Sequence, residues 1–110
     1  MGFHSYLQKN NIPLESVMSK VWNKKIFKHI QESVDQASKD LADERGPCPD
    51  AADYGFNERF SNKTAIAPTA SISIICGGAS PGVEPIAANS YTHKTLSGSF
   101  NVRNRYLVEL

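Results

Sequence analysis

The chain has 110 residues, of which 40% are hydrophobic and 21% are charged, a composition that predicts one soluble globular domain with a modest core. Twelve basic against eleven acidic residues leave a net charge of +1, which argues against a nucleic-acid partner or an anionic membrane surface. No window approaches the roughly 18 consecutive apolar residues of a membrane-spanning helix. We therefore expect a cytoplasmic protein with no membrane or nucleic-acid partner.

The cysteines and histidines carry no recognisable site. Cys48 and Cys76 are far apart and lack a C-x-x-C spacing, which predicts free thiols in a reducing compartment. His4, His29 and His93 are scattered without metal-ligand spacing. The sequence therefore predicts structural or surface positions for all three histidines and no metal site.

The first ten residues are predicted to be helical. Phe3, Tyr6 and Leu7 have the spacing of one helix face, and the pattern stops at Asn10, before Pro13.

A long helix is predicted from Val17 to Glu44, with Ser16 as its N-cap and Gly46, Pro47 and Pro49 ending it. Its apolar residues recur at intervals of three and four and form one stripe: Val21, Trp22, Ile26, Phe27, Ile30, Val34, Ala37 and Leu41. Charged residues are expected to form a solvated opposite face: Lys24, Lys25, Lys28, Glu32, Asp35 and Lys39.

The polar stretch from Cys48 to Lys63 is predicted to be irregular. Asp50 and Asp53 lie in it, and acids beside prolines are more often turn formers than a catalytic pair. After it, residues 64–73 are predicted to form a buried strand, and residues 74–85, rich in Gly and Pro, a loop or broken helix.

The C-terminal part is predicted to be a hairpin, with Tyr91–Leu96 against Ser99–Val102 and Gly98 between them. This layout leaves a physical problem. A helix of about 28 residues spans roughly 42 Å, longer than a compact chain of this size is wide. One buried strand also cannot form a sheet by itself. Both points indicate a segment of a larger fold.

The bend at Pro68 is the candidate ligand site. Pro68 ends strand pairing, and the hydroxyls of Thr69, Ser71 and Ser73 follow it. If a helix begins near Ala70 or Ser71, its unpaired first-turn amides would suit a phosphate. The stretch lacks the spacing of a P-loop or of a G-x-G-x-x-G turn. The alternative is a turn whose hydroxyls only satisfy their own backbone.

Five motifs, in this order and at these distances, resemble a known family. They are Met1-Gly2-Phe3-His4, Glu44-Arg45-Gly46-Pro47-Cys48-Pro49, Ala65-Ile66-Ala67-Pro68-Thr69-Ala70-Ser71-Ile72-Ser73, Gly82-Val83-Glu84-Pro85 and Tyr91-Thr92-His93-Lys94-Thr95-Leu96-Ser97-Gly98-Ser99-Phe100. The chain resembles, over essentially its whole length, the C-terminal part of the catalytic barrel in the large (alpha) subunit of class I ribonucleotide reductases. Residues 1–110 are thus expected to be one fragment of that barrel domain.

The resemblance implies an α/β fold class. The chain would be a partial segment of a ten-stranded α/β barrel, dominated by one long amphipathic helix plus a buried strand and loops. It implies an oxidoreductase that reduces ribonucleoside diphosphates to deoxyribonucleotides by thiyl-radical chemistry. Residues Pro68, Thr69, Ala70, Ser71 and Ile72 would be the loop that holds the substrate phosphates, and Thr69 and Ser71 would be its hydroxyl donors.

The resemblance places the radical step elsewhere. The family's Cys-x-Glu finger loop, its partner cysteines, its relay tyrosines and its C-terminal reducing cysteines have no counterpart here, and Cys48 and Cys76 do not follow their patterns. No catalytic residue, metal or bound cofactor is therefore expected in this segment, which should be inactive alone. The intact enzyme implies a radical-generating small (beta) subunit with a metal centre, ATP and dNTP effectors, and the remainder of the large subunit.

Other positions and other functions stay open. Glu84 could shape the pocket or close a loop, and His93, Lys94, Arg103 and Arg105 are expected to contact other parts of the barrel. The alternatives to a reductase segment are a helical interaction module, such as one piece of a split reductase, and a phosphate-binding module without catalysis.

Overall fold

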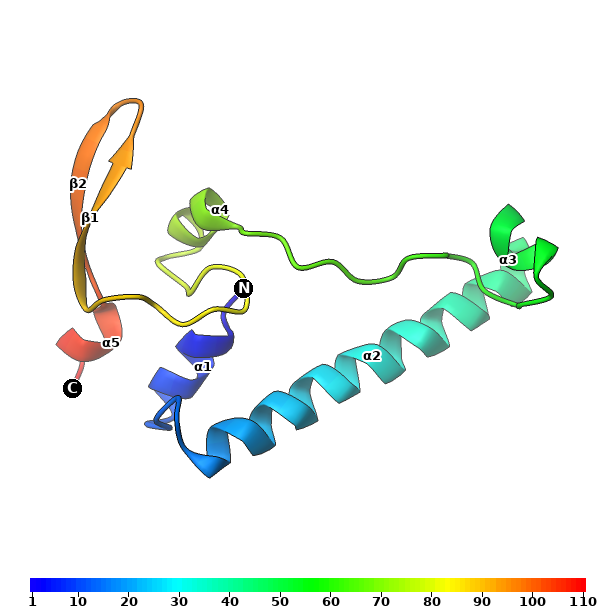
Figure 1. Ribbon diagram of the computed structural model, residues 1–110, viewed down its shortest axis with the longest axis horizontal. Coiled ribbons are helices and arrows are strands. Elements are labelled where there is room, and N and C mark those ends of the chain that lie inside the picture. The colour runs from blue at the N-terminus through cyan, green and yellow to red at the C-terminus, as the bar shows by residue number, and fades with distance from the viewer. The chain divides into compact units, whose positions relative to one another are not determined.

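The computed structural model describes all 110 residues. They form two compact units, one of residues 1–19 with 66–110 and the other of residues 20–65. The elements, shown in Figure 1, are α1 (Phe3–Lys9), α2 (Val17–Arg45), α3 (Pro49–Asp53), α4 (Ala70–Ile75), β1 (Ser90–Thr95), β2 (Gly98–Arg103) and α5 (Arg105–Val108).

Helix α1 confirms the prediction for the first ten residues. Leu7 is fully buried, and α1 packs against α5 in the same unit. The helix ends where Asn10 donates its backbone N–H to the carbonyls of Tyr6 and Leu7, both at 3.2 Å. Asn11 follows with a φ of 54°, a left-handed conformation that Asn tolerates and that does not continue a helix.

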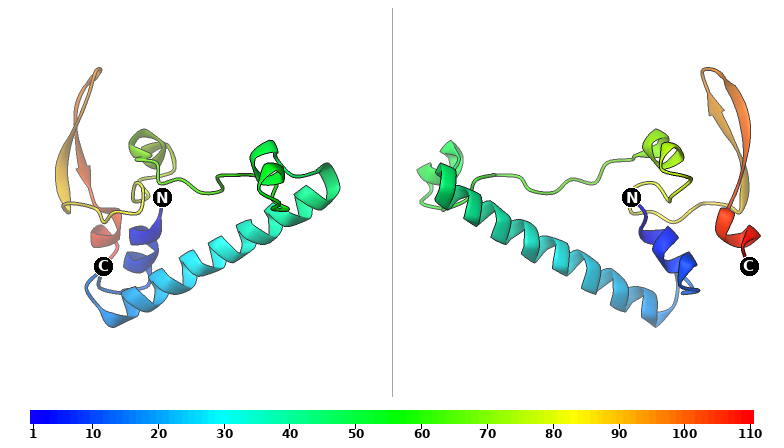
Figure 2. Two further views of the ribbon diagram at one scale, coloured as in Figure 1. Left: turned by 45° about the vertical axis from the view of Figure 1, so that its right-hand side comes forward. Right: turned by 180° about the vertical axis from the view of Figure 1, so that it is seen from behind.

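The predicted hairpin is also confirmed. Strands β1 and β2 are antiparallel, with Tyr91 opposite Val102 and His93 opposite Phe100. Residues 96 and 97 join them, and Figure 2 shows the twisted pair from two further sides. Because side chains alternate along a strand, these four residues share one face of the hairpin.

The buried strand predicted for residues 64–73 is wrong for this chain. No residue from 62 to 69 belongs to a strand, and the Ile66 side chain is 79% exposed. A strand exists only where a neighbour accepts and donates its backbone hydrogen bonds, and the hairpin is the chain's two-stranded sheet. Helix α4 occupies the second half of the predicted strand instead.

Helix α2 matches its prediction to within one residue. Its N-cap is Ser16, whose Oγ accepts from the Ser19 amide at 3.2 Å. At the other end, the Gly46 amide donates to the Ala42 carbonyl at 2.8 Å, and Gly46 takes the left-handed φ of 83° that ends the helix. The 29-residue helix runs without a break in every view (Figures 1 and 2).

The apolar stripe of α2 is incompletely covered. Trp22, Ile26, Val34 and Leu41 are half-buried, whereas Val21 is 50% exposed and Ile30 is 41% exposed. The side chains with which the stripe could pack are therefore not all supplied by the chain.

In the second unit, hydrogen bonds and an ion pair join α2 to residues 59–63. Ser38, which is 2% exposed, accepts with its Oγ from the amides of Arg59 at 3.1 Å and Phe60 at 3.3 Å. Lys63 forms ion pairs with Asp35 and Glu58. Asp35, predicted on the solvated face, keeps 39% of its side chain exposed, although the returning chain brings Lys63 to it.

The stretch predicted to be irregular contains the short helix α3. Pro49 is its first residue, where the missing N–H costs nothing because first-turn amides lack helical partners in any case. Asp50 and Asp53 lie in α3, and both are exposed.

The core is small. Leu7, Ala42 and Ala51 are the buried hydrophobic residues, and most large apolar side chains are at least 38% exposed. No helix is long and apolar enough to cross a membrane.

Candidate functional site

The candidate loop, residues 68–72, lies at the start of α4 and is open to solvent. Helix α4 begins at Ala70, as one alternative in the sequence predicted. The Ser73 amide donates to the Thr69 carbonyl at 2.9 Å, whereas the amides of Ala70, Ser71 and Ile72 have no backbone acceptor. All loop residues except half-buried Thr69 are exposed. Three backbone donors are therefore available to an anion.

The hydroxyls of the loop differ in what they can do. Thr69 Oγ1 accepts from the Gly82 amide at 2.8 Å and keeps its own proton for a further bond. The Ser71 side chain is exposed, and its hydroxyl makes no hydrogen bond within the chain. Buried Ser73, outside the predicted loop, donates its hydroxyl to the Ala70 carbonyl at 2.6 Å and so satisfies its own backbone, as the alternative prediction had it.

Thr69 holds an unusual backbone conformation. Its φ is 52°, and with Asn11 it is one of the two non-glycine residues with positive φ. A β-branched residue in this region is a genuine outlier that costs about 1–2 kcal/mol. This conformation turns the chain from Pro68 into α4, and the hydrogen bond from Gly82 to its side chain contributes to holding it.

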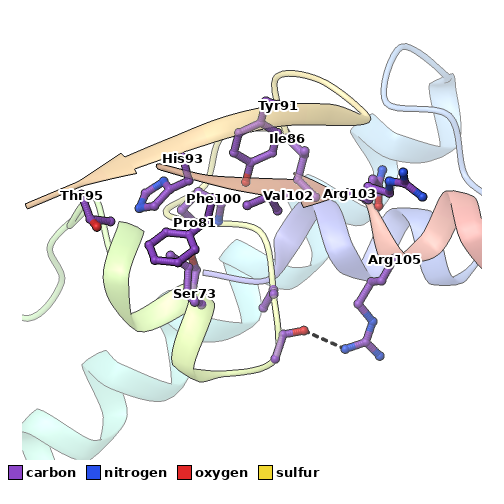
Figure 3. Close-up of a pocket in the computed structure, with 15 residues that line it drawn as sticks. Ser73, Pro81, Ile86, Tyr91, His93, Thr95, Phe100, Val102, Arg103 and Arg105 are labelled. Carbon is purple, nitrogen blue, oxygen red and sulfur yellow. Dashed lines mark hydrogen bonds between the residues drawn. The ribbon is translucent and has the colours of Figure 1, made fainter. Parts of the chain in front are cut away.

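A cavity of about 570 Å³ lies between α4 with its following turn and the hairpin, within the first unit. Figure 3 shows Tyr91, His93 and Phe100 on the hairpin side, opposite Pro81 and Ser73. Arg105 closes one end, since its Nη1 donates to the Gly77 carbonyl at 2.9 Å.

A second cavity of about 270 Å³ reaches the candidate loop itself, through Ala70. Glu84 and His93 also line it. An anion at the loop would therefore meet one carboxylate, which opposes it, and one imidazole, which can donate to it. The sequence left the role of Glu84 open, and here it lines the cavity.

A buried polar network that the sequence did not predict ties α1 to residues 80–86. The amide of Ser5 donates to Ser80 Oγ at 3.1 Å, and the amide of Ser80 donates to Ser5 Oγ at 2.8 Å. The Ile86 amide donates to His4 Nδ1 at 2.9 Å, and burial lowers the pKa of His4 below its ordinary value. One signal was present, because Gly2 at the N-cap has no side chain and α1 must find an acceptor elsewhere.

The remaining candidates are not gathered into a site. Cys48 is half-buried, Cys76 is exposed and both are free thiols. No group of three His, Cys, Asp or Glu residues is arranged to hold a metal ion. Arg103 and Arg105 line the larger cavity and Lys94 is exposed on β1.

Comparison with known proteins gives matches over the whole chain. The model of the ribonucleotide reductase barrel domain matches residues 1–58 and 50–110. The ribonucleoside-diphosphate reductase large subunit of Invertebrate iridescent virus 3 is 46% identical over 110 residues, which are 100% of this chain and 17% of the viral protein. A vitamin B12-dependent ribonucleoside-diphosphate reductase of Thermoplasma acidophilum is 37% identical over 103 residues, 89% of this chain and 13% of that protein.

A solved structure agrees. The Actinobacillus ureae class Id ribonucleotide reductase alpha subunit matches with a TM-score of 0.74 and 43% identity, over 81% of this chain and 17% of that subunit. The chain thus spans 13–17% of the length of these relatives.

Proposed function

The chain belongs to the ribonucleotide reductase family, as part of the barrel domain, and we propose that its residues 68–72 hold the phosphates of a ribonucleoside diphosphate in a reductase large subunit. The observation that carries the proposal is the start of α4, where three amides without acceptors and the unbonded Ser71 hydroxyl follow the Pro68 bend. Such a set of donors suits an anion with several acceptor oxygens.

Each residue has a distinct role in this proposal. Ala70, Ser71 and Ile72 donate their amides, and Ser71 adds its hydroxyl. Thr69 donates its hydroxyl proton to the phosphate, while its Oγ1 accepts from the Gly82 amide. Pro68 has no N–H and a fixed φ, so it ends the extended segment before the loop.

Holding the phosphates contributes to catalysis without chemistry at the loop. The phosphates are remote from the ribose, so binding energy gained there fixes the sugar against the reacting groups and reduces the entropic cost of the reaction. The thiyl-radical step belongs to other parts of the barrel, and no step of it is assigned to residues 1–110. The chain alone is expected to bind weakly and to show no turnover.

The same proposal places the chain in a ten-stranded α/β barrel. Residues 64–68 are extended and exposed, with Ile66 79% exposed, and would pair with strands from the rest of the barrel. The uncovered apolar residues of α2 would pack against that remainder as well. Support comes from the TM-score of 0.74 with a reductase alpha subunit.

We assign the chain to class I, a cytoplasmic reductase whose radical comes from a metal centre on a small subunit and which responds to ATP and dNTP effectors. Relatives described as a large subunit and as a class Id alpha subunit support this assignment. A relative described as vitamin B12-dependent makes a cobalamin reductase the alternative. No group of three His, Cys, Asp or Glu residues in this chain is arranged to hold a metal ion.

The test is a chimera in which this chain replaces the matching 110 residues of the iridescent-virus large subunit. Ser71→Ala removes one hydrogen bond to a charged ligand, worth about 1.5–3 kcal/mol, and is expected to raise KM for the diphosphate about tenfold or more with a smaller effect on kcat. Ser61→Ala, at an exposed serine outside the loop, is the matched control. If the chimera is active and Ser71→Ala leaves its KM for the diphosphate unchanged, the proposal is contradicted.

A helical interaction module is the second candidate, favoured by the 50% and 41% exposure of Val21 and Ile30 on α2. Co-expression of the chain with the rest of the viral subunit, as two polypeptides, tests it. Co-purification of the two polypeptides supports docking through this surface. A chain that stays monodisperse and does not bind the rest of the subunit contradicts it.

A further inference from the structure

Residues 80–86, here termed the anchored segment, connect α1 to the candidate phosphate loop. Both ends of this segment are bonded to the first turn of α1, and its third residue is bonded to Thr69. All of these residues lie in one unit, residues 1–19 with 66–110.

The first end of the anchored segment is held by three hydrogen bonds. The Gly2 amide donates to the Ser80 carbonyl at 2.8 Å, and Ser5 and Ser80 exchange amide-to-hydroxyl bonds at 3.1 and 2.8 Å. Ser80 is fully buried and Ser5 is 6% exposed. No titratable group takes part, so this end is insensitive to pH.

The other end depends on one imidazole. His4 Nδ1 accepts from the Ile86 amide at 2.9 Å. A ring nitrogen accepts only when it carries no proton, so this bond requires neutral His4 with its proton on Nε2. A protonated ring donates from both nitrogens and leaves the Ile86 amide without an acceptor.

Between its two ends the anchored segment reaches the loop. The Gly82 amide donates to Thr69 Oγ1 at 2.8 Å, and Thr69 has the left-handed φ of 52° that turns the chain into α4. The orientation of the Thr69 hydroxyl therefore depends on where the anchored segment holds Gly82.

We propose that His4 is a positioning residue, which in its neutral form holds the anchored segment and thereby the Thr69 hydroxyl at the phosphate loop. Protonation of His4 releases the Ile86 end and weakens phosphate binding. This inference rests on the proposed function, because it concerns the same loop.

No charged group is among the causes of the His4 pKa shift. The charged groups on α1 and on the segments bonded to it or packed against it are the Met1 amino group, Lys9, Glu84 on the anchored segment, Arg105 on α5 and Glu109 directly after α5. Burial is the one cause of the His4 shift, and it lowers the pKa from 6.5. The bond is therefore complete at neutral pH and is lost as the pH falls through the lowered pKa.

The experiment uses the full-length chimera, measured between pH 5 and 8. His4→Asn places an amide oxygen near the position of Nδ1 and accepts without titrating, whereas His4→Leu accepts nothing. The ratio of KM in the unsubstituted chimera to KM in His4→Asn cancels the titration of the substrate phosphate, which is common to both proteins. This ratio is expected to be near one at pH 8 and to rise as the pH falls through the lowered pKa of His4, toward the order of fivefold that one hydrogen bond is worth.

His4→Leu is expected to show the raised KM at every pH, and inhibition by pyrophosphate is expected to weaken in parallel. A ratio that stays flat with pH, while Ser71→Ala raises KM, overturns the role of His4 and leaves the proposed function standing. If Ser71→Ala has no effect, the phosphate loop itself is refuted.

A second measurement needs no substitution. Hydrogen exchange of the Ile86 amide, corrected for the intrinsic pH dependence, is expected to lose protection as the pH falls through the lowered pKa of His4, while the Ser80 amide keeps its protection. Equal behaviour of the two amides overturns the proposal even if a variant does not fold.

Discussion

The anchored segment finds its hydrogen-bond partners within the chain, whereas the apolar stripe of α2 is only partly covered by it. Around the anchored segment the polar groups find partners within the chain, and Ser80 is fully buried. Along α2, by contrast, Val21 and Ile30 stay 50% and 41% exposed. The difference indicates that the loop geometry is set by hydrogen bonds within the chain, whereas the apolar stripe of α2 is not fully covered by the chain itself.

The largest effect is expected from Ser80→Ala, which leaves the buried Ser5 amide without an acceptor. An unsatisfied buried donor costs up to about 3 kcal/mol. Hydrogen exchange of the Ser5 amide should accelerate by about a hundredfold. The control is Ser99→Ala on exposed β2. Equal exchange in the two variants would show that the segment is not anchored at Ser80.

Ser38→Ala should act in the second unit by a similar mechanism. Ser38 Oγ accepts from two partly buried amides, so its loss is expected to cost about 1–2 kcal/mol of unfolding free energy. Ser33→Ala is the matched control on an exposed position of the same helix. Urea unfolding compares the two, and an equal midpoint would contradict the assigned bonds.

Gly82→Ala tests how closely the anchored segment is folded. The φ of Gly82 is 50°, and an added Cβ would overlap the Glu84 side chain. The left-handed conformation alone costs an alanine about 1 kcal/mol. Gly78→Ala is the matched control, because Gly78 also has a left-handed φ, 76°, and an added Cβ there meets no atom within 4 Å. The end of the exposed Glu84 side chain can rotate away from the added Cβ, so thermal unfolding should show similar midpoints for Gly82→Ala and Gly78→Ala, and a clearly lower midpoint for Gly82→Ala would show that Glu84 is held in place.

Ile30→Gln tests whether the apolar stripe of α2 stabilises the chain itself or binds the rest of the large subunit. Because Ile30 is already 41% exposed, its replacement is expected to change the unfolding free energy of the chain by less than about 0.5 kcal/mol. Binding of the chain to the rest of the viral subunit should weaken measurably in a pull-down titration. A large loss of stability without any loss of binding would mean that the stripe serves the chain itself.

The smallest effect is a pH dependence at Glu58. A hydrogen bond from Ser38 and the charge of Lys63 lower the pKa of Glu58 below 4.5, against the opposing effect of burial. Its contribution to stability is therefore complete above pH 4.5 and is lost as the pH falls through the lowered value. Glu58→Gln should flatten this acid limb in urea unfolding, whereas Glu15→Gln should not.

The elements that the sequence predicted are those with a local pattern. The 3.6-residue period and the Ser16 cap were sufficient for α2, and alternation around Gly98 was sufficient for the hairpin. The strand predicted at residues 64–73 is absent, because a strand must pair with a neighbour, and the two strands of this chain pair with each other.

The candidate site was predictable only in part. Pro68 and the hydroxyls after it marked the start of α4, because capping and backbone restriction are local effects. The anchored segment was not predictable, since its bonds join residues 75 and 82 positions apart and leave no spacing to detect. The sequence left open whether the hydroxyls bond an anion or their own backbone, and at Ser73 the hydroxyl bonds the backbone of its own helical turn.

The most direct test of the central claim is a crystal structure of the chimeric large subunit with a ribonucleoside diphosphate bound. The account predicts phosphate oxygens within about 3.2 Å of the amides of Ala70, Ser71 and Ile72 and of the Ser71 hydroxyl. A diphosphate bound with its phosphates away from the start of α4, and with those amides facing solvent, would contradict it.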